Sequence, residues 1–150
     1  MTDEQKPDEI TPSFAIKGQY IKDLSFENPR APESLVMMQE EPPKIELNVN
    51  IKADRVQETL YETTLIIEAS AKGKQGTLFL TDLKYAGLFE LVGIPEDRLQ
   101  PILFVDCAFV LYPFARRVIA DVTRDGGFPP LMLEPIDFQA LYLQNQPQPE

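Results

Sequence analysis

The chain has 150 residues, 43% of them hydrophobic, and 14 lysines and arginines against 24 aspartates and glutamates, a formal net charge of −10. This balance argues against binding to a phosphate backbone, which depends on lysine and arginine, and it favours solubility and the steering of basic partners. The length and the ordinary apolar fraction predict one globular domain with a packed core.

Both ends of the chain are polar, and no run of apolar residues approaches the roughly 20 needed to cross a membrane. The first residues, MTDEQKPDEITPS, are acidic, which is the opposite of a signal peptide. The single cysteine, Cys107, excludes an intrachain disulfide. We therefore expect a cytoplasmic protein whose domain spans residues 14–143, between disordered tails of residues 1–13 and 144–150.

Four segments alternate apolar and polar side chains with a period of two, which is the pattern of strands that bury one face. The first segment, residues 14–27, places Phe14, Ile16, Tyr20, Leu24 and Phe26 on one side and Lys17, Gln19, Asp23, Ser25 and Glu27 on the other. The others lie at residues 44–55, at 61–69, and between residues 79 and 91. Short connections, including a glycine-containing hairpin at residues 72–76, predict a four-stranded antiparallel sheet.

Helical patterns fill much of the remaining chain, so the predicted fold class is α+β, with the sheet packed on helices. A crossover segment of residues 33–43 follows the strand-breaking NPRAP, and a short helix starts near Pro95. The main helix begins at Cys107 and ends at the glycines 126 and 127. Pro101 and Pro113 bracket the entry to this helix, and Pro113 either kinks it or lies in its first turn. A proline-framed connector, residues 128–135, leads to a last helix that begins within residues 135–137.

The main helix is apolar over most of its circumference. One face is formed by Ala108, Phe109, Tyr112, Ala115, Ile119 and Val122, and much of the rest by Val110, Leu111, Phe114 and Val118. A helix of this kind is buried on more than one side. In a small protein that usually requires a second subunit, so we expect an oligomer.

Signals of catalysis are poor. The chain has no histidine, the usual general base and commonest metal ligand. Cys107 lies on the apolar helix, where a small core residue is expected rather than a nucleophile. Asp23 and Glu27 share a strand face, but four residues of strand separate them by about 13 Å, beyond the carboxylate spacings of glycosidases. We expect no enzyme, no metal site and no cofactor.

Two sets of apolar residues are candidates for binding. Leu78 and Leu80, beside Asp82, and Ile66 lie on the outer face of the sheet, although scattered exposed aliphatic residues are normal on any protein. Residues 35–38, 128–133 and 138–142 combine methionines and aromatics on proline-framed segments, which suits a surface that repacks around varied partners. The alternative is that the residues of this second set are core residues, which pack on the sheet and bind no partner. An oligomeric adaptor or scaffold that binds a folded partner also remains open.

The segments VLYPFAR and GGFPPLMLEPIDFQALY, together with YIKDLSFENPRAP at residues 20–32 and FLTDLKYAGLF at residues 79–89, closely resemble the SecB family of bacterial protein-export chaperones. The resemblance implies a homotetramer built as a dimer of dimers, with helices between two outer sheets. It also implies an ATP-independent chaperone that keeps unfolded precursor proteins competent for translocation and delivers them to the SecA motor ATPase. The positions that match the family's SecA-docking site are Asp23, Glu27, Leu80 and Asp82, the last where the family more often has glutamate.

In SecB proteins the unfolded clients lie in long hydrophobic grooves between the crossover segment, the sheet and the final helix. The resemblance therefore predicts a client-binding groove lined by Leu35, Val36, Met37, Met38, Phe128, Leu131, Leu133, Phe138, Leu141 and Tyr142. Together with the apolar main helix, it predicts a subunit interface formed by Phe109, Tyr112, Ala115, Arg116, Ile119 and Val122.

Overall fold

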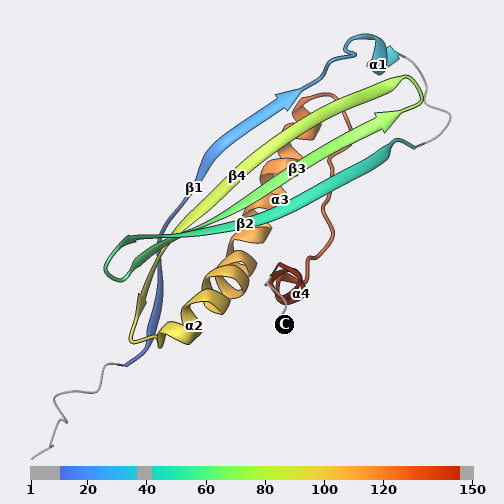
Figure 1. Ribbon diagram of the computed structural model, residues 1–150. Helices are drawn as coiled ribbons and strands as arrows, with labels where there is room; N and C mark the ends of the chain where they lie inside the picture. The colour runs from blue at the N-terminus through green and yellow to red at the C-terminus, as the bar shows by residue number, and fades with distance from the viewer. Residues whose placement is uncertain (1–10, 37–41, 146–150) are drawn as a thin grey trace, which may run out of the picture.

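A computed structural model describes residues 11–36 and 42–145 as one antiparallel sheet with helices on one of its faces (Figure 1). The strands are β1 (Ser13–Glu27), β2 (Lys44–Gln57), β3 (Leu60–Gly73) and β4 (Gly76–Val92). Their order in the sheet is β1-β4-β3-β2, so β3 and β4 are central and β1 and β2 are edges. The predicted α+β class with four antiparallel strands is confirmed.

The helices that cover the sheet form one continuous stretch. Helix α2 (Glu96–Pro101) runs into a π-helical segment, η1 (Ile102–Asp106), and then into α3 (Cys107–Asp125). Pro113 lies inside α3 rather than in its first turn. Pro113 and Phe109 are both exposed, so the hydrogen bond that proline cannot donate is lost on the solvent side of the helix.

Two short helices complete the fold. Helix α1 (Glu33–Val36) lies in the crossover from β1 to β2, and α4 (Phe138–Gln144) follows the connector. The Asp137 side chain caps α4 by accepting a hydrogen bond from the backbone N–H of Ala140 at 3.0 Å. β1 begins and α4 ends one residue outside the predicted domain of residues 14–143. None of the described helices is long and apolar enough to cross a membrane.

The core lies between α3 and the two central strands. Its fully buried side chains include Leu65, Ile67, Leu83, Phe89, Leu111 and Ile119. Gly87 on β4 allows this close packing, because a Cβ atom there would lie 2.7 Å from Cδ2 of Leu111. The helix-facing alternation predicted for the second, third and fourth strands matches the observed register, since inward residues pair with inward residues.

The alternation predicted for the first strand is wrong in its middle. Two β-bulges interrupt β1, between Ile16 and Gly18 and between Ile21 and Asp23. Each bulge inserts one unpaired residue, so the first inverts the alternation and the second restores it.

Between the bulges the two faces of β1 are exchanged. Gln19 pairs with Gly87 and so faces the helices, where its Oε1 accepts a hydrogen bond from the Tyr85 hydroxyl at 3.1 Å. Tyr20 pairs with Ala86 and so lies on the outer face, where its hydroxyl donates to Glu62. The prediction had placed Gln19 outward and Tyr20 inward.

Candidate binding surfaces

The four residues predicted as a docking site gather on the outer face of the sheet. In the register of β1 and β4, Glu27 lies opposite Leu80 and Asp82 lies opposite Ser25. Asp23 lies one pair further along the same face, opposite Lys84. Leu80 is exposed beside the carboxylates, so an apolar contact is available within an acidic surface.

A shallow depression of about 380 Å³ continues this surface across β4, β3 and β2. It is lined by Glu46, Leu47, Asn48, Glu68, Ala69, Ser70, Leu80 and Asp82. Glu68 lies opposite Asp82 in the sheet, and Lys72 forms an ion pair with Glu46 at 3.1 Å. Sequence reasoning did not name Glu46 or Glu68 for this site, although the alternation of their strands already placed both on the outer face.

This end of the outer face is predominantly negative. Among the described residues, no cation lies within ion-pair distance of Asp23, Glu27, Glu68 or Asp82. The prediction of Leu78 as an exposed outer residue is wrong, because its side chain is only 5% exposed and belongs to a small apolar cluster with Ala71 and Phe79. A bulge in the pairing of β3 with β4 lies at this point.

The residues predicted for the client groove divide into exposed and buried groups. Leu35 and Val36 on α1 are exposed, Val36 to 80%. Leu133 and Phe138 are buried and belong to the core, and the remaining described members are half-buried: Phe128, Leu131, Leu141 and Tyr142. Met37 and Met38 lie outside the described residues.

Aromatic contacts attach the connector and α4 to the rest of the subunit. The ring of Phe128 packs on Phe79 with centroids 5.0 Å apart, and Phe79 stacks on Phe26 at 5.9 Å. Further along, Phe138 meets the edge of Tyr112 at 5.6 Å. Phe138 is therefore part of the packing that attaches α4 to the subunit, while Val36 is exposed.

Further exposed apolar residues lie on the helix side of the sheet. Ile45 and Leu47 on β2 pair with the buried Ala71 and Ala69, so they face the helices, yet both are exposed. Met132 in the connector is 64% exposed. Figure 1 shows the connector descending from α3 past β3 and β2 to α4 on this side of the sheet. The strand alternation indicated the inward direction of Ile45 and Leu47 but not that the helices leave them uncovered.

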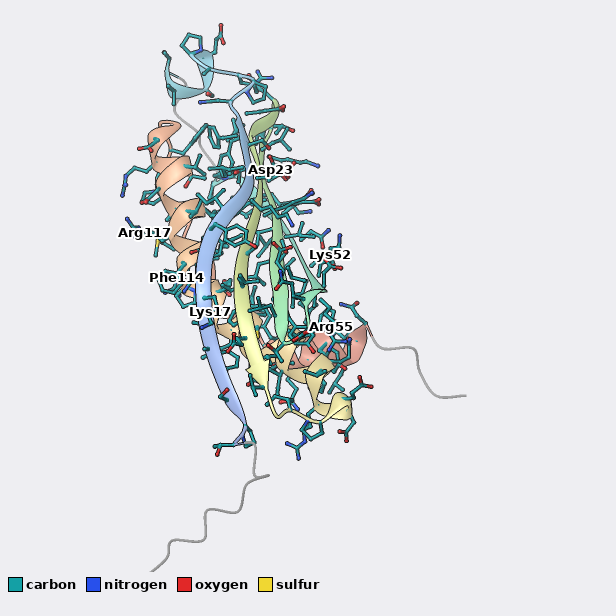
Figure 2. All side chains as sticks on the ribbon, turned by 90° about the vertical axis from the view of Figure 1, so that its left-hand side faces the viewer. Lys17, Asp23, Lys52, Arg55, Phe114 and Arg117 are labelled. Atoms are coloured by element: carbon teal, nitrogen blue, oxygen red, sulfur yellow. The ribbon has the colours of Figure 1, made fainter. Side chains whose placement is uncertain are left out.

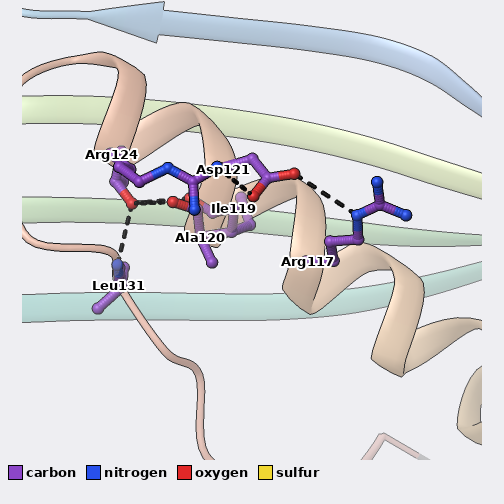
Figure 3. Close-up of polar contacts among 7 residues, drawn as sticks. Arg117, Ile119, Ala120, Asp121, Arg124 and Leu131 are labelled. Carbon is purple, nitrogen blue, oxygen red and sulfur yellow. Dashed lines mark hydrogen bonds and ion pairs between the residues drawn. The ribbon is translucent and has the colours of Figure 1, made fainter.

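The connector is also held by hydrogen bonds to α3. The hydroxyl of Thr123 accepts a hydrogen bond from the backbone N–H of Leu131 at 2.9 Å, and it donates to the carbonyl of Ile119 at 2.8 Å (Figure 3). The hydroxyl of Tyr112 donates to the backbone carbonyl of Glu134. Burial raises the pKa of Tyr112, so this hydroxyl stays protonated and remains a donor.

The predicted subunit interface is corrected by the packing of α3. Tyr112, Ala115 and Ile119 are buried within the subunit, because this face of the helix packs on the sheet and the connector. Arg116 and Val122 are partly accessible, and Phe109 is 70% exposed.

A second uncovered apolar surface, not predicted, lies along β1. Its helix-facing residues Phe14, Ile16, Ile21 and Leu24 are exposed, as is Phe114 on α3. Figure 2 looks onto β1 and shows Phe114 on the part of α3 that lies beside the strand. We call these five residues the flank patch.

Cys107 is a core residue, as predicted. It is fully buried, and this burial raises the pKa of its thiol to about 12. A thiol in this state supplies almost no thiolate at neutral pH, so it is not a nucleophile.

The family model described as "Preprotein translocase subunit SecB" matches residues 7–149. A protein-export protein SecB of Bradyrhizobium is 48% identical over 134 residues, covering 89% of this chain and 82% of the relative. That of Methylocella silvestris is 47% identical over 140 residues, covering 93% and 86%.

A solved structure supports the fold. The SecB-like chaperone of Mycobacterium tuberculosis, in complex with a ChAD peptide from the HigA1 antitoxin, superimposes with a TM-score of 0.68 at 19% identity, covering 82% of this chain and 90% of that one. At this identity the likeness concerns the fold alone. The family match and the relatives assign the function, which is that of a chaperone and not of an enzyme. The chain belongs to the SecB family of protein-export chaperones.

Proposed function

We propose that the protein binds unfolded precursor proteins in an apolar groove on the helix side of the sheet and delivers them to the SecA ATPase through the acidic outer face. The observation that carries this proposal is the exposed apolar set around the connector: Leu35, Val36, Ile45, Leu47 and Met132. A soluble subunit rarely leaves so many large apolar residues uncovered on one side without a partner.

The binding step needs no ATP. An unfolded chain exposes the apolar side chains that a folded protein buries, and burying them in the groove contributes about 25 cal/mol per Å². This energy is spread over many weak contacts, so the groove accepts different sequences. Folded proteins expose few such side chains, so the groove does not bind them.

The delivery step uses a separate surface. Asp23, Glu27 and Asp82 lie on the face of the sheet opposite to the helices, so SecA can dock while a client occupies the groove. Opposite charges across an interface accelerate association and fix its orientation. We propose a basic surface on SecA as the complement, with Leu80 as the apolar contact among the charges.

We propose that the protein acts in the cytoplasm as a homotetramer, a dimer of dimers. The flank patch and the exposed Phe109 support this proposal, because both leave apolar area uncovered on the isolated subunit. Pairing of two flank patches would cover β1, and contacts through the solvent side of α3 would join the dimers. In this arrangement the interface is formed by Phe109, Arg116 and Val122 together with the flank patch.

The experiment that tests the client-binding function is a calorimetric titration with one precursor, held unfolded in one series and folded in the other. We expect binding of the unfolded chain only, with a negative heat-capacity change from apolar burial. Binding of the folded form only would favour an adaptor that recognises a folded partner. No binding of either form would refute the proposed groove.

A further inference from the structure

The connector between α3 and α4 is held in an extended conformation without a neighbouring strand. Its first backbone hydrogen bond runs from the N–H of Phe128 to the carbonyl of Thr123 at 3.1 Å. From residue 129 to residue 136, no backbone group bonds to the backbone of another described residue. The conformation of this segment must therefore be specified by its side chains and by partners on other elements.

Two hydroxyls on α3 supply those partners. Thr123 is fully buried, and its oxygen accepts the hydrogen bond from the N–H of Leu131 while its own hydrogen satisfies a carbonyl one turn earlier in the helix. Tyr112, about three turns earlier on the same helix, donates to the carbonyl of Glu134. One bond thus lies at each end of the segment 131–134.

The two bonds determine which side chains face inward. Leu131 is half-buried, Leu133 is buried, and Met132 between them is 64% exposed, as expected for an extended segment with alternating directions. If the segment slipped by one residue, Met132 would turn inward and its two neighbours would turn outward. The hydrogen bonds fix the segment against such a slip.

We propose that Thr123 and Tyr112 are positioning residues of the client groove, which hold segment 131–134 so that Met132 projects toward the bound chain. This inference rests on the client-binding role proposed above. A wall that is ordered before the client arrives does not lose further conformational freedom on binding, and this strengthens the complex. Neither hydroxyl needs to touch the client.

Paired substitutions separate the hydroxyl from the rest of each side chain. Thr123→Val keeps the shape of threonine but leaves the N–H of Leu131 without its acceptor, whereas Thr123→Ser keeps the acceptor. Tyr112→Phe removes only the second hydroxyl and provides an independent variant if Thr123→Val fails to fold. Thr81→Val is the matched control, because Thr81 is equally buried and its hydroxyl donates to the carbonyl of Ser25 on β1 at 2.9 Å rather than to a group of the connector.

The experiment measures the Kd for a precursor held unfolded, and the hydrogen exchange of the connector amides in the free protein. We expect Thr123→Val and Tyr112→Phe to raise the Kd about fivefold, which corresponds to roughly 1 kcal/mol. Exchange at Leu131, whose N–H donates to Thr123, should accelerate in both. Thr123→Ser and Thr81→Val should remain within about twofold of the natural protein in Kd, with unchanged exchange at this amide.

Two results would overturn the inference. One is faster connector exchange with an unchanged Kd, which would show that the bonds are structural only. The other is an equal loss of affinity in Thr81→Val, which would trace the effect to general destabilisation. If the natural protein binds no unfolded chain, the proposed function fails instead, and connector exchange in Thr123→Val still shows whether the hydroxyl holds the segment.

Discussion

The hydroxyl of Tyr20 on β1 donates a hydrogen bond to the carboxylate of Glu62 on β3, although these strands are not neighbours and β4 runs between them. The contact forms because the bulges of β1 turn Tyr20 to the outer face. Lys22 adds a second hydrogen bond to the same carboxylate at 2.6 Å. β1 and β3 are thereby joined across β4 by one side-chain cluster on the outer face.

The cluster predicts a pH-dependent contribution to stability. The hydrogen bonds from Lys22 and then from Tyr20 hold the pKa of Glu62 below its ordinary value of 4.5. A carboxylate with a lowered pKa stabilises the fold above its unfolded pKa, and the contribution is lost as the pH falls through its folded pKa. Glu62→Gln should therefore lower the free energy of unfolding at neutral pH by about 1 kcal/mol. In urea denaturation, the difference from the natural protein should shrink below about pH 4.

The control for Glu62→Gln is Glu68→Gln on the same face of the same strand, which forms no ion pair with any described residue. It should change stability little at either pH. A Glu62→Gln difference that is equal at acidic and neutral pH would contradict the assignment of the effect to the charged carboxylate.

The outer face should be needed for SecA and not for clients. Replacing Asp23 and Glu27 by lysine reverses two charges of the docking surface, and we expect SecA binding to weaken at least roughly tenfold. Affinity for an unfolded precursor should stay the same, since the proposed groove lies on the other face of the sheet. The measurement is titration of each ligand in parallel.

Asp54→Lys provides the control for the docking prediction. Asp54 lies on the same face toward the opposite end of the sheet, opposite Glu62 in the register. Charge reversal there should leave SecA binding within about threefold of the natural protein, because screening limits the reach of surface charges to about 10 Å. Parallel loss of SecA and client binding in Asp23→Lys/Glu27→Lys would contradict the division into two surfaces.

The flank patch should determine assembly. A charge at Ile16 or Phe114 would have to be buried without a partner in the proposed interface, which costs several kcal/mol. Ile16→Lys and Phe114→Glu should therefore reduce the mass measured by light scattering at micromolar concentration. Val56→Lys, at an exposed apolar position on the far edge strand β2, should leave the mass unchanged. An unchanged mass in both flank variants would remove this patch from the interface.

The thiol of Cys107 should report on unfolding. It is fully buried and its pKa is raised to about 12, so an aqueous thiol reagent should modify it only when the core opens. The modification rate should follow the equilibrium of global unfolding measured in urea. Val36→Cys introduces an exposed thiol that should react at once. Rapid modification of Cys107 in the native protein would contradict its placement in the core.

The sequence predicted most of the fold because three of its strands alternate with interruptions only near their ends. In β2, β3 and β4 most inward positions carry apolar residues, with Thr63 and Thr81 as buried polar exceptions, and the register pairs these positions with one another. The middle of β1 was predicted wrongly because a bulge has no strong signature when polar and apolar residues are mixed. Gly18, at the first bulge, is a local signal of an interruption, because an isolated glycine inside a strand often marks a bulge, whereas Lys22 gives no such signal at the second.

The candidate surfaces were only partly predictable. The outward positions of Asp23, Glu27, Leu80 and Asp82 follow from alternation outside the bulges, and the register brings them together. The faces of α3 could not be assigned, because the helix is apolar almost all round and the sequence does not say which side meets the sheet. Only the structure shows that Tyr112 belongs to the core and that Phe114 is exposed.

The bulges of β1 also determine which changes in length this strand can tolerate. Deleting the unpaired residue of one bulge, such as Lys22, would remove that bulge and keep the pairing on both sides of it, so Asp23 and Glu27 would stay on the outer face. A deletion away from the bulges would instead shift the register by one residue and exchange the two faces of the strand beyond it. Single-residue deletions in β1 of homologues should therefore be found at the bulge positions Lys17 and Lys22 rather than elsewhere in the strand.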